Sequence, residues 1–436
     1  MGSRAHCRAA GWAMEGWTRR CILRRDVEVG QDAREGSVSE SVGPRLERWM
    51  SLVGEAGYDG WLVADFRWNN PLFARLLGLQ SGILSRRCFL WLPAPGRGEP
   101  CVLASAVDGH AVSGLDCQVT LYGGFEEMSA RLGDLLRGRS QVAMEYVELG
   151  RLPTVSRVDA GLVELIRGYG VAIQSSGRLV SALEAWDERQ RALHDRAARG
   201  VDAARRRALD HCAAALAAGH EVTEGSLAAL ILASFADDGL EPGDGPDVGV
   251  NAHSADPHYS ISGAGAVVGR DSVLLIDLWA RVRDAAGGPY ADSTWMAYTG
   301  ATAPPDVLRA FTAVRDARDA ALAAIVAASD AGREITGRAV DRAARTVIEH
   351  AGLADHLIHR TGHSLAADHV HGMGTNLDDV EFPDDRPLLP WTGFTVEPGL
   401  YWPGQYGLRL EVSAILEPGG PRVTTESQTD LTLMRP

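Results

Sequence analysis

The sequence predicts an α/β domain followed by an α+β domain that is built from two matching halves. Over residues 44–185, short apolar runs alternate with helical stretches, a pattern typical of a layered α/β domain. From residue 186 onwards the composition changes to Ala- and Arg-rich helices followed by strand-like runs. This order, two helices and then strands, occurs twice over residues 186–436. It indicates an internal duplication with a pseudo-two-fold axis.

The first segment of the chain differs from the rest in composition. Residues 1–40 are polar and rich in Arg, Glu and Ser, so we expect a disordered extension over residues 1–43. Glu15 and the Arg19–Arg20 pair interrupt any apolar core of the signal-peptide kind. The remaining length is sufficient for two domains, each with a full hydrophobic core.

The elements of the first domain follow from periodicity. Leu46, Trp49, Met50 and Val53 are spaced as on one face of a helix, which we expect to end at Gly57. Further helices are expected near 125–137 and 157–169. Short buried strands are predicted at 60–64, 87–93, 100–104, 118–122 and 141–145.

The second domain is predicted to begin with a long helix that ends at Ala218. A second helix is expected at 223–238, with Thr223 as its N-cap. Strand-like runs follow at 247–251, 259–268 and 273–282. The second half repeats this order, with helices at 304–329 and 336–350 and strand-like runs near 357–362, 392–397 and 406–416.

The bulk composition excludes several classes of partner. The formal net charge of −14 argues against nucleic acid or an anionic membrane as the main partner. No apolar run is long enough to cross a membrane. The six cysteines are scattered without CxxC spacing, which is typical of reduced thiols in a cytoplasmic protein.

Carboxylates inside apolar runs are the main functional signal. Asp277 lies within Val273–Trp279, and Glu397 follows Phe394–Val396 directly before Pro-Gly. A buried carboxylate without a partner costs several kcal/mol, roughly, so each needs a compensating group. Two further carboxylates and an imidazole occur in similar surroundings, namely Asp292, Glu411 and His363. Two divalent metal ions would explain all five.

Each of these residues has an ordinary alternative when it is considered alone. Asp277 would suit a strand end, and Asp292 a turn. Alternation along 408–412 places Arg409 and Glu411 on one face, where they would form a solvent-facing charge pair. His363, His369 and His371 would be ordinary loop histidines. The prediction of a metal site therefore rests on the order in which all these residues occur along the chain.

That order closely resembles the creatinase/aminopeptidase P/prolidase family of pita-bread metallopeptidases, known as M24. The resemblance covers residues 45–436, and its first part resembles the family's creatinase-type N-terminal domain. It implies a domain boundary between residues 185 and 186 and a pita-bread catalytic domain over 186–436. The motifs that carry it are Asn251–Tyr259, Thr361–Ser364, Val370–Gly372, Thr395–Tyr401 and Gly407–Glu411.

The resemblance implies roles for individual residues. Two divalent metal ions, manganese above cobalt, zinc or iron, would be held by Asp277, Asp292, His363, Glu397 and Glu411. Asp292 and Glu411 would bridge both ions. Glu397 would also assist the water as a catalytic residue, while His258 and His371 would hold the substrate carbonyl and the tetrahedral intermediate. Arg409 is a candidate for binding a substrate carboxylate or for orienting Glu411.

The activity implied is hydrolysis of a peptide bond by a metal-bridging hydroxide, as in an Xaa-Pro aminopeptidase or Xaa-Pro dipeptidase. The bond before proline is a tertiary amide without an N–H, so a dedicated pocket for the proline ring is expected. The alternative is another hydrolase or a lyase that acts on a small molecule with the same scaffold. The resemblance also implies a cytoplasmic homodimer.

The sequence departs from the family pattern in several ways, two of which change the spacing between site residues. Asp277 and Asp292 are fifteen residues apart (292 − 277), more than is usual in the family, which suggests an inserted hairpin tip at 282–288. The segment between His363 and His371 is one residue longer than usual. If that insertion shifts the register, His369 takes the role assigned to His371. We favour His371 because Val370–Gly372 fits the family motif.

Overall fold

The computed structural model describes residues 42–79, 83–283 and 287–434. The predicted extension over residues 1–43 lies outside the described residues except at its last two positions. Residues 284–286, the centre of the predicted hairpin tip, also lie outside them.

The first part of the chain forms a six-stranded mixed sheet in the order β4-β3-β2-β1-β5-β6. Its central strand β1 is antiparallel to β2 and parallel to β5. Its strands are β1 (Gly60–Phe66), β2 (Arg87–Pro93), β3 (Cys101–Ser105), β4 (Gln118–Tyr122), β5 (Gln141–Met144) and β6 (Ala172–Ser175). Its helices are α1 (Val42–Glu55), α2 (Pro71–Leu77), η1 (Ala106–Ala111), α3 (Phe125–Leu136), η2 (Glu148–Gly150), α4 (Ala160–Gly168) and α5 (Gly177–Leu183).

Both faces of this sheet are buried. Trp61 and Val63 of β1 belong to one hydrophobic cluster, whereas Leu62 between them belongs to another. Since neighbouring side chains on a strand point to opposite faces, helices must cover the sheet on both sides. This arrangement confirms the predicted α/β layers.

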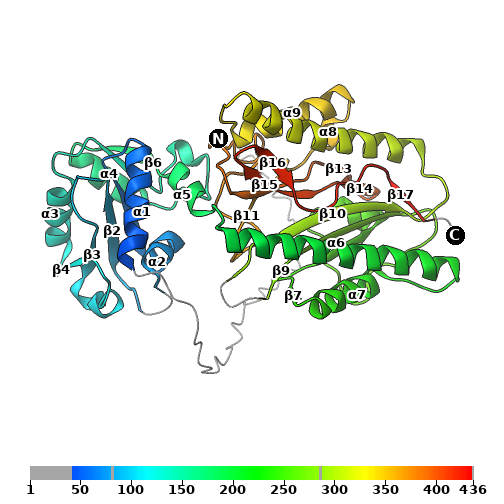
Figure 1. Ribbon diagram of the computed structural model, residues 1–436, viewed down its shortest axis with the longest axis horizontal. Coiled ribbons are helices and arrows are strands. Elements are labelled where there is room, and N and C mark those ends of the chain that lie inside the picture. Colours follow the sequence, from blue (N-terminus) through cyan, green and yellow to red (C-terminus); the bar gives the residue numbers. More distant parts are fainter. Residues whose placement is uncertain (1–41, 80–82, 284–286, 435–436) are drawn as a thin grey trace, which may run out of the picture. The chain divides into compact units, whose positions relative to one another are not determined.

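The next part begins with α6 (Glu188–Ala217) and α7 (Glu224–Asp237). The side chain of Thr223 accepts a hydrogen bond from Ser226 N, so the predicted N-cap of α7 is confirmed. The following elements are β7 (Leu240–Glu241), β8 (Asp247–Val250), η3 (Asn251–Ala255), β9 (Val273–Val282) and β10 (Ala291–Tyr298). Strand β9 pairs with β7, β8 and β10, and α6 runs along β9 and β10 (Figure 1).

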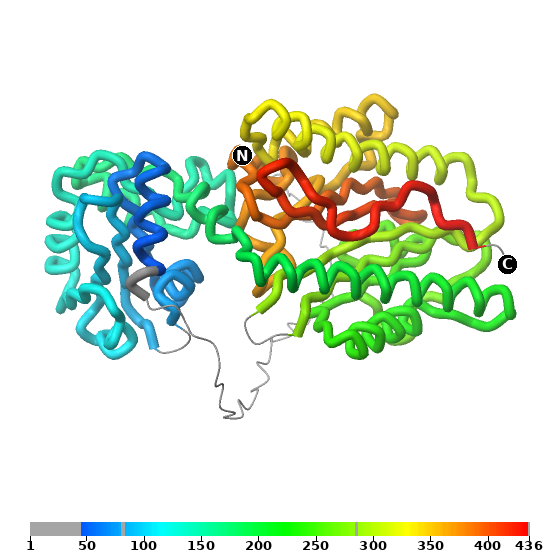
Figure 2. The backbone as a smooth tube through the Cα atoms, in the orientation of Figure 1, coloured from blue at the N-terminus to red at the C-terminus, as the bar shows by residue number. Residues whose placement is uncertain are grey.

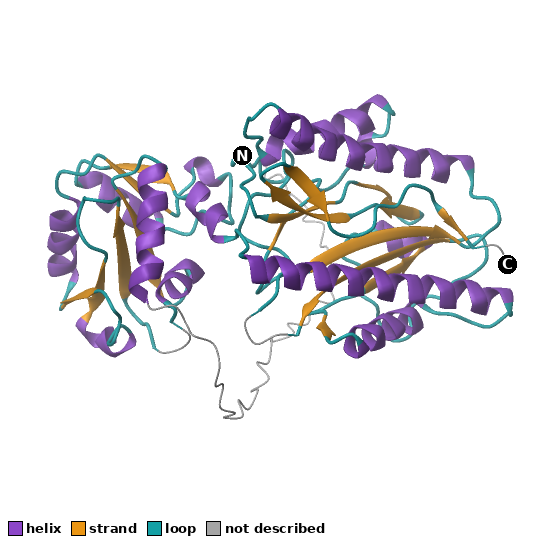
Figure 3. Ribbon diagram, viewed as in Figure 1, coloured by secondary structure: helices purple, strands orange, loops and turns teal. Residues whose placement is uncertain are grey.

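The second half repeats two helices followed by strands. It consists of α8 (Pro305–Asp330), α9 (Gly337–His350), η4 (Ala354–His356), β11 (Ser364–Leu365), β12 (Gly393–Val396), β13 (Gly399–Trp402), β14 (Tyr406–Arg409), β15 (Val412–Glu417) and β16 (Gly420–Val423). One sheet has the order β11-β12-β15-β16, and β13 pairs with β14. Figure 3 shows helices of both halves outside the strands of this domain. The predicted duplication is confirmed in its order of elements.

The last strand joins the two halves. β17 (Thr432–Leu433) pairs in parallel with β10 of the first half. Figure 2 shows this C-terminal segment in red beside the green strands. In addition, Glu411 N donates to Thr294 O at 3.2 Å, which connects the chain before β15 to β10. The two halves therefore share a hydrogen-bonded centre.

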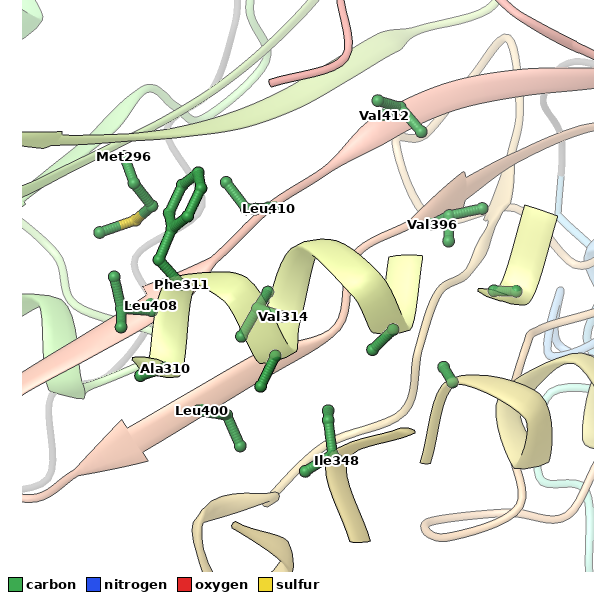
Figure 4. Packing of buried hydrophobic residues seen from close by; sticks show 14 of the residues in the cluster. Met296, Ala310, Phe311, Val314, Ile348, Val396, Leu400, Leu408, Leu410 and Val412 are labelled. Atoms are coloured by element: carbon green, nitrogen blue, oxygen red, sulfur yellow. The ribbon is translucent and has the colours of Figure 1, made fainter. Parts of the chain in front are cut away.

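Packing in the core of the second half determines which side chains near β14 point into the core and which point away from it. Leu408, Leu410 and Val412 pack into a buried cluster with Phe311 and Val314 of α8 (Figure 4). The alternating residues Arg409 and Glu411 are also buried, but they line a cavity instead. The predicted alternation is confirmed, and the solvent-facing charge pair is excluded.

Two strand predictions are wrong. Residues 259–268 form a loop, in which Gly263 and Gly265 adopt positive φ angles of 64° and 66°. The buried carboxylate of Glu224 accepts from Ala266 N at 2.6 Å, and Val267 forms an isolated bridge with Thr223. Residues 357–362 are also irregular, and the strand there is the short β11 at 364–365. Helix lengths and apolar content rule out a membrane-crossing helix in the part of the chain that is described.

Candidate metal centre

All five predicted ligands line one cavity of about 550 Å³ in the second domain. Its lining also includes the other predicted site residues, His258, His369, His371 and Arg409. Three of the ligand side chains, those of Asp292, His363 and Glu411, offer ligand atoms that all lie within 4.8 Å of one another. The structure thus brings together residues that are up to 134 positions apart (411 − 277).

The two aspartates come from adjacent strands of the first half. In the antiparallel β9–β10 pair, Asp277 lies opposite Thr294, and Asp292 lies opposite Trp279. Asp277 and Asp292 are 8% and 5% exposed. Thr294 Oγ1 lies 2.9 Å from Asp277 Oδ1 and 2.7 Å from Glu411 Oε2. One hydroxyl hydrogen cannot satisfy both carboxylates, so this centre is short of donors.

The two glutamates adjoin the ends of a second strand pair. Val396 of β12 lies opposite Val412 of β15. Glu397 follows the first of these residues and Glu411 precedes the second, so their backbones lie at the same end of the ladder. Thr395 Oγ1 donates to Glu397 Oε1 at 3.2 Å. The predicted strand that carries a carboxylate to Pro-Gly therefore ends at the cavity.

His363 presents a lone pair to this centre. Its Nδ1 lies 3.1 Å from Ser364 O, and because a carbonyl only accepts, Nδ1 carries the hydrogen. Its Nε2 then has no hydrogen and lies 3.5 Å from Glu397 Oε1 and 3.7 Å from Asp292 Oδ2. Burial and the nearby Arg360 guanidinium lower the pKa of His363 to about 3, so the ring is neutral.

Two carboxylate oxygens in the centre have no hydrogen-bond partner. Among the described residues, Asp292 Oδ1 and Glu411 Oε1 are buried and unsatisfied. Burial and the carboxylates of Asp277 and Glu397 raise the pKa of Asp292 well above its usual value. Burial and the Asp292 and Glu397 carboxylates do the same to the pKa of Glu411. Unsatisfied acceptors that face one another are the arrangement that a bound cation stabilises.

The three candidate histidines differ in their distance from the centre. The His371 ring lies 4.2 Å from the His363 ring, between centroids, in an edge-on arrangement. His369 lies next to His371, at 5.8 Å between ring centroids, and its Nδ1 accepts from His371 N at 3.0 Å. His258 is exposed at the cavity wall. The geometry favours His371 over His369 for a role beside the ligands.

Arg409 contacts a different ligand from the one that the sequence suggested. Its guanidinium pairs with the carboxylate of Asp277, whereas a substrate carboxylate or Glu411 was expected. Arg409 Nε also donates to Thr294 Oγ1 at 3.1 Å, and Nη1 lies 3.3 Å from the Tyr401 hydroxyl. Its direct effect is therefore to fix Asp277.

Sequence reasoning missed several residues of the cavity. Asp247, Trp279, Arg360 and Glu381 also line it. Asp247 is placed there by the pairing of β8 with β9, where it lies opposite Asp277. A carboxylate at the start of a predicted strand was the available signal, but only the pairing register shows which residue it faces.

Sequence reasoning also missed the residue that holds the loop of His258. Glu224 is fully buried and accepts hydrogen bonds from Val250 N, Tyr259 Oη and Ala266 N. His253 Nδ1 lies 2.8 Å from the same carboxylate. Glu224 therefore anchors both ends of the segment that carries His258.

A family model and several relatives match this chain. Residues 192–417, more than half of the chain, match the model of metallopeptidase family M24. The probable dipeptidase PepE of Mycobacterium tuberculosis is 31% identical over 176 residues, which are 40% of this chain and 42% of that protein. The Xaa-Pro dipeptidase of Lactobacillus helveticus is 34% identical over 27% of this chain and 30% of its own length. Each match thus spans less than half of the curated relative.

Solved structures show the same fold over most of the chain. Dipeptidase PepE from Mycobacterium ulcerans is 22% identical with a TM-score of 0.63, covering 90% of this chain and 98% of that one. X-prolyl aminopeptidase from Caenorhabditis elegans, described as a cytosolic enzyme with a di-nuclear active site, is 16% identical. It has a TM-score of 0.60 and covers 88% of this chain and 62% of that one. These likenesses confirm the predicted fold class, and the family model shows that the chain belongs to metallopeptidase family M24.

Proposed function

We propose that this chain hydrolyses short peptides with two divalent metal ions, preferring the bond before a proline. The observation that carries the proposal is the acceptor-only centre, in which Asp292, His363 and Glu411 offer ligand atoms within 4.8 Å of one another. Membership of metallopeptidase family M24 supports the same reading.

The residues present fit a pair of cations. The donor set contains four carboxylates and one neutral imidazole, and oxygen-rich sets of this kind suit Mn, Fe, Co or Zn. Asp292 Oδ1 and Glu411 Oε1 are buried and unsatisfied, as the two expected bridging ligands would be without an ion. Asp277 and Glu397 flank these two carboxylates and would complete the set.

When bound, such ions polarise a carbonyl and lower the pKa of water towards neutrality. The proposed part of Glu397 is to accept a proton from the attacking water. Burial raises the pKa of Glu397, which brings its basicity closer to that needed at neutral pH. Thr395 Oγ1, which donates to Glu397 Oε1 at 3.2 Å, keeps the carboxylate in place.

The histidines of the cavity wall are proposed to hold the substrate. His258 and His371 would donate hydrogen bonds to the carbonyl oxygen as its negative charge develops. Support comes from the position of His371, whose ring lies 4.2 Å from that of His363. Arg409, through its pair with Asp277, would keep that ligand oriented rather than bind the substrate itself.

The choice of bond rests on the relatives. Two relatives that match this chain are named Xaa-Pro dipeptidase, one of Lactobacillus helveticus and one of Lactobacillus delbrueckii. PepE of Mycobacterium tuberculosis is named a probable dipeptidase without mention of proline. We therefore propose dipeptides as the first substrates to test, with proline second in the sequence.

The test uses full-length protein that is stripped of metal and then loaded with Mn, Co, Fe or Zn. Ala-Pro, Ala-Pro-Ala and Ala-Ala would be offered, and released amino acids measured. We expect turnover of Ala-Pro that depends on metal. A protein that binds two equivalents of metal and cleaves none of these peptides would contradict the proposal.

Three further properties stay predictions. Manganese as the native metal is tested by elemental analysis of protein purified without added metal. A homodimer is tested by light scattering of the eluted protein. A cytoplasmic location is tested by fractionation of the native cells.

A further inference from the structure

One wall of the cavity is formed by a tryptophan beside the candidate metal ligands. Trp279 lies on β9 directly opposite Asp292 of β10, and it lines the same cavity. Its ring packs on the loop before β8, where a Cβ on Gly245 would lie only 2.4 Å from Trp279 Cζ2. The indole is therefore held against the loop backbone, and its bulk takes up space next to the metal centre.

The same wall carries negative charge that the Arg409 guanidinium compensates only in part. Asp247 of β8 lines the cavity and lies opposite Asp277. Within the described ranges 42–79, 83–283 and 287–434 its side chain forms no hydrogen bond or salt bridge, and the Arg409 guanidinium, which pairs with Asp277, acts on it only through space. Asp244, an exposed residue three positions earlier in the loop before β8, also lines the cavity.

Besides Arg409, which pairs with Asp277, the cavity has a second guanidinium, and this one comes from a different segment. Arg360 lines the cavity, and its Nε is buried without a hydrogen-bond partner. Its guanidinium is 3.6 Å from Glu381, which compensates only part of its donors. The cavity thus offers carboxylates from the β8 and β9 side and cationic or donor groups from residues 360–371. A zwitterionic short peptide has matching charges at its two ends.

We propose that Asp247 and Trp279 form the subsite for the substrate's first residue: Asp247 binds the free ammonium group, and Trp279 limits the side chain to a small one. This inference deepens the proposed peptidase function and rests on it for the position of the scissile bond. That the cavity is a ligand site follows independently from the buried, unsatisfied oxygens of Asp292 and Glu411.

The two roles predict separate effects on binding. Asp247 is partly buried, and a hydrogen bond to its charged carboxylate is stronger than a neutral one, so blocking the ammonium by acetylation should weaken binding about tenfold or more. The extra carbons of leucine over alanine should meet the indole and cost a further factor of about ten. Asp247→Asn should remove most of the loss of affinity that acetylation causes. Trp279→Ala should remove most of the loss that leucine causes.

The experiment measures peptide binding to Mn-loaded full-length protein by calorimetry. A Glu397→Gln background removes the proposed proton acceptor, so that peptide is bound without being cleaved. Ala-Pro, N-acetyl-Ala-Pro and Leu-Pro are compared in that background and with Asp247→Asn or Trp279→Ala added. Metal content is measured for every variant. Asp355→Asn serves as the matched control, because it removes the same charge at an exposed position outside the cavity.

We expect acetylation to weaken binding by less than about threefold only in Asp247→Asn. We expect the weaker binding of Leu-Pro relative to Ala-Pro to be reduced only in Trp279→Ala. Unchanged penalties in these variants, with metal still bound, would overturn it. Failure of the proposed function looks different: the binding pattern would hold, but wild-type protein would not cleave Ala-Pro. A holoprotein that binds none of the three peptides would overturn both.

Discussion

His363 Nε2 faces Glu397 Oε1 at 3.5 Å, and when Glu397 is ionised neither atom has a hydrogen to offer the other. The imidazole hydrogen is on Nδ1, which donates to Ser364 O at 3.1 Å. A lone pair held opposite a carboxylate is unfavourable in a buried site unless a positive charge lies near both. The folded chain therefore maintains an arrangement whose stability improves when a cation binds.

The first prediction concerns stability with and without metal. Adding Mn to metal-free protein should raise its melting temperature, because the cation binds only the folded centre. At a concentration about 100 times the dissociation constant, one site contributes about 2.7 kcal/mol. Differential scanning fluorimetry checks this shift. Asp292→Asn with Glu411→Gln should abolish it, and a shift of equal size in that double variant would place the metal elsewhere.

The second prediction concerns the proposed proton acceptor. Glu397→Gln should lower kcat/KM for Ala-Pro by about 10²–10⁴-fold, the usual effect of losing a general base. Asp292→Asn should also remove activity, through loss of a ligand. Circular dichroism should show both variants folded. Retained turnover in both variants would refute these site assignments.

The third prediction concerns the anchor of the His258 loop. Glu224→Ala leaves four donors without their buried acceptor, so it should reduce stability by roughly 2–5 kcal/mol. The midpoint of urea unfolding measures this loss. Glu221→Ala is the matched control, since Glu221 is exposed three residues earlier. Limited proteolysis of Glu224→Ala should cut within residues 251–268, whereas the same cleavage rate in both variants would argue against an anchoring role.

The fourth prediction concerns pH and lies outside the catalytic cavity. Burial raises the pKa of Glu145 from its usual value to about 7, although Trp61 Nε1 donates to it at 2.6 Å. The folded state therefore binds this proton more tightly than the unfolded state. Stability from this group is complete below about pH 4.5 and is lost as pH rises towards 7, by an amount on the order of 3 kcal/mol.

Glu145→Gln tests that linkage because it mimics the protonated form. Urea midpoints measured between pH 5 and 8 should fall with rising pH more steeply in wild-type protein than in the variant. Parallel pH profiles for the two proteins would show that protonation of Glu145 does not contribute to the pH dependence of stability.

Sequence signals predicted the helices and strands that are determined by residues close to one another in the chain. The aliphatic run 273–282 matches β9, and Thr223 caps α7 as predicted. The loop at 259–268 was misread because its backbone is held by Glu224, which is more than thirty residues earlier. Such a long-range side-chain acceptor leaves no periodic signal.

The sequence was sufficient to predict the ligand residues of the candidate site, but not the contacts between them. The order of acids and His363 was sufficient to expect one cavity, and all five residues line it. The pairing of Arg409 with Asp277, and the presence of Asp247 and Trp279 on the wall, depend on which strands are neighbours. Strand registers are tertiary properties, so residue spacing alone could not give these contacts.

The central claim is that two cations occupy the centre formed by these residues. A crystal structure of the Mn-loaded protein, with diffraction measured at the manganese absorption edge, tests it most directly. We predict two anomalous peaks in the cavity. Each would mark a manganese ion bound by Asp292 and Glu411, and one of the two ions would also be bound by His363. Mn-loaded, active protein without anomalous density between these side chains would contradict it.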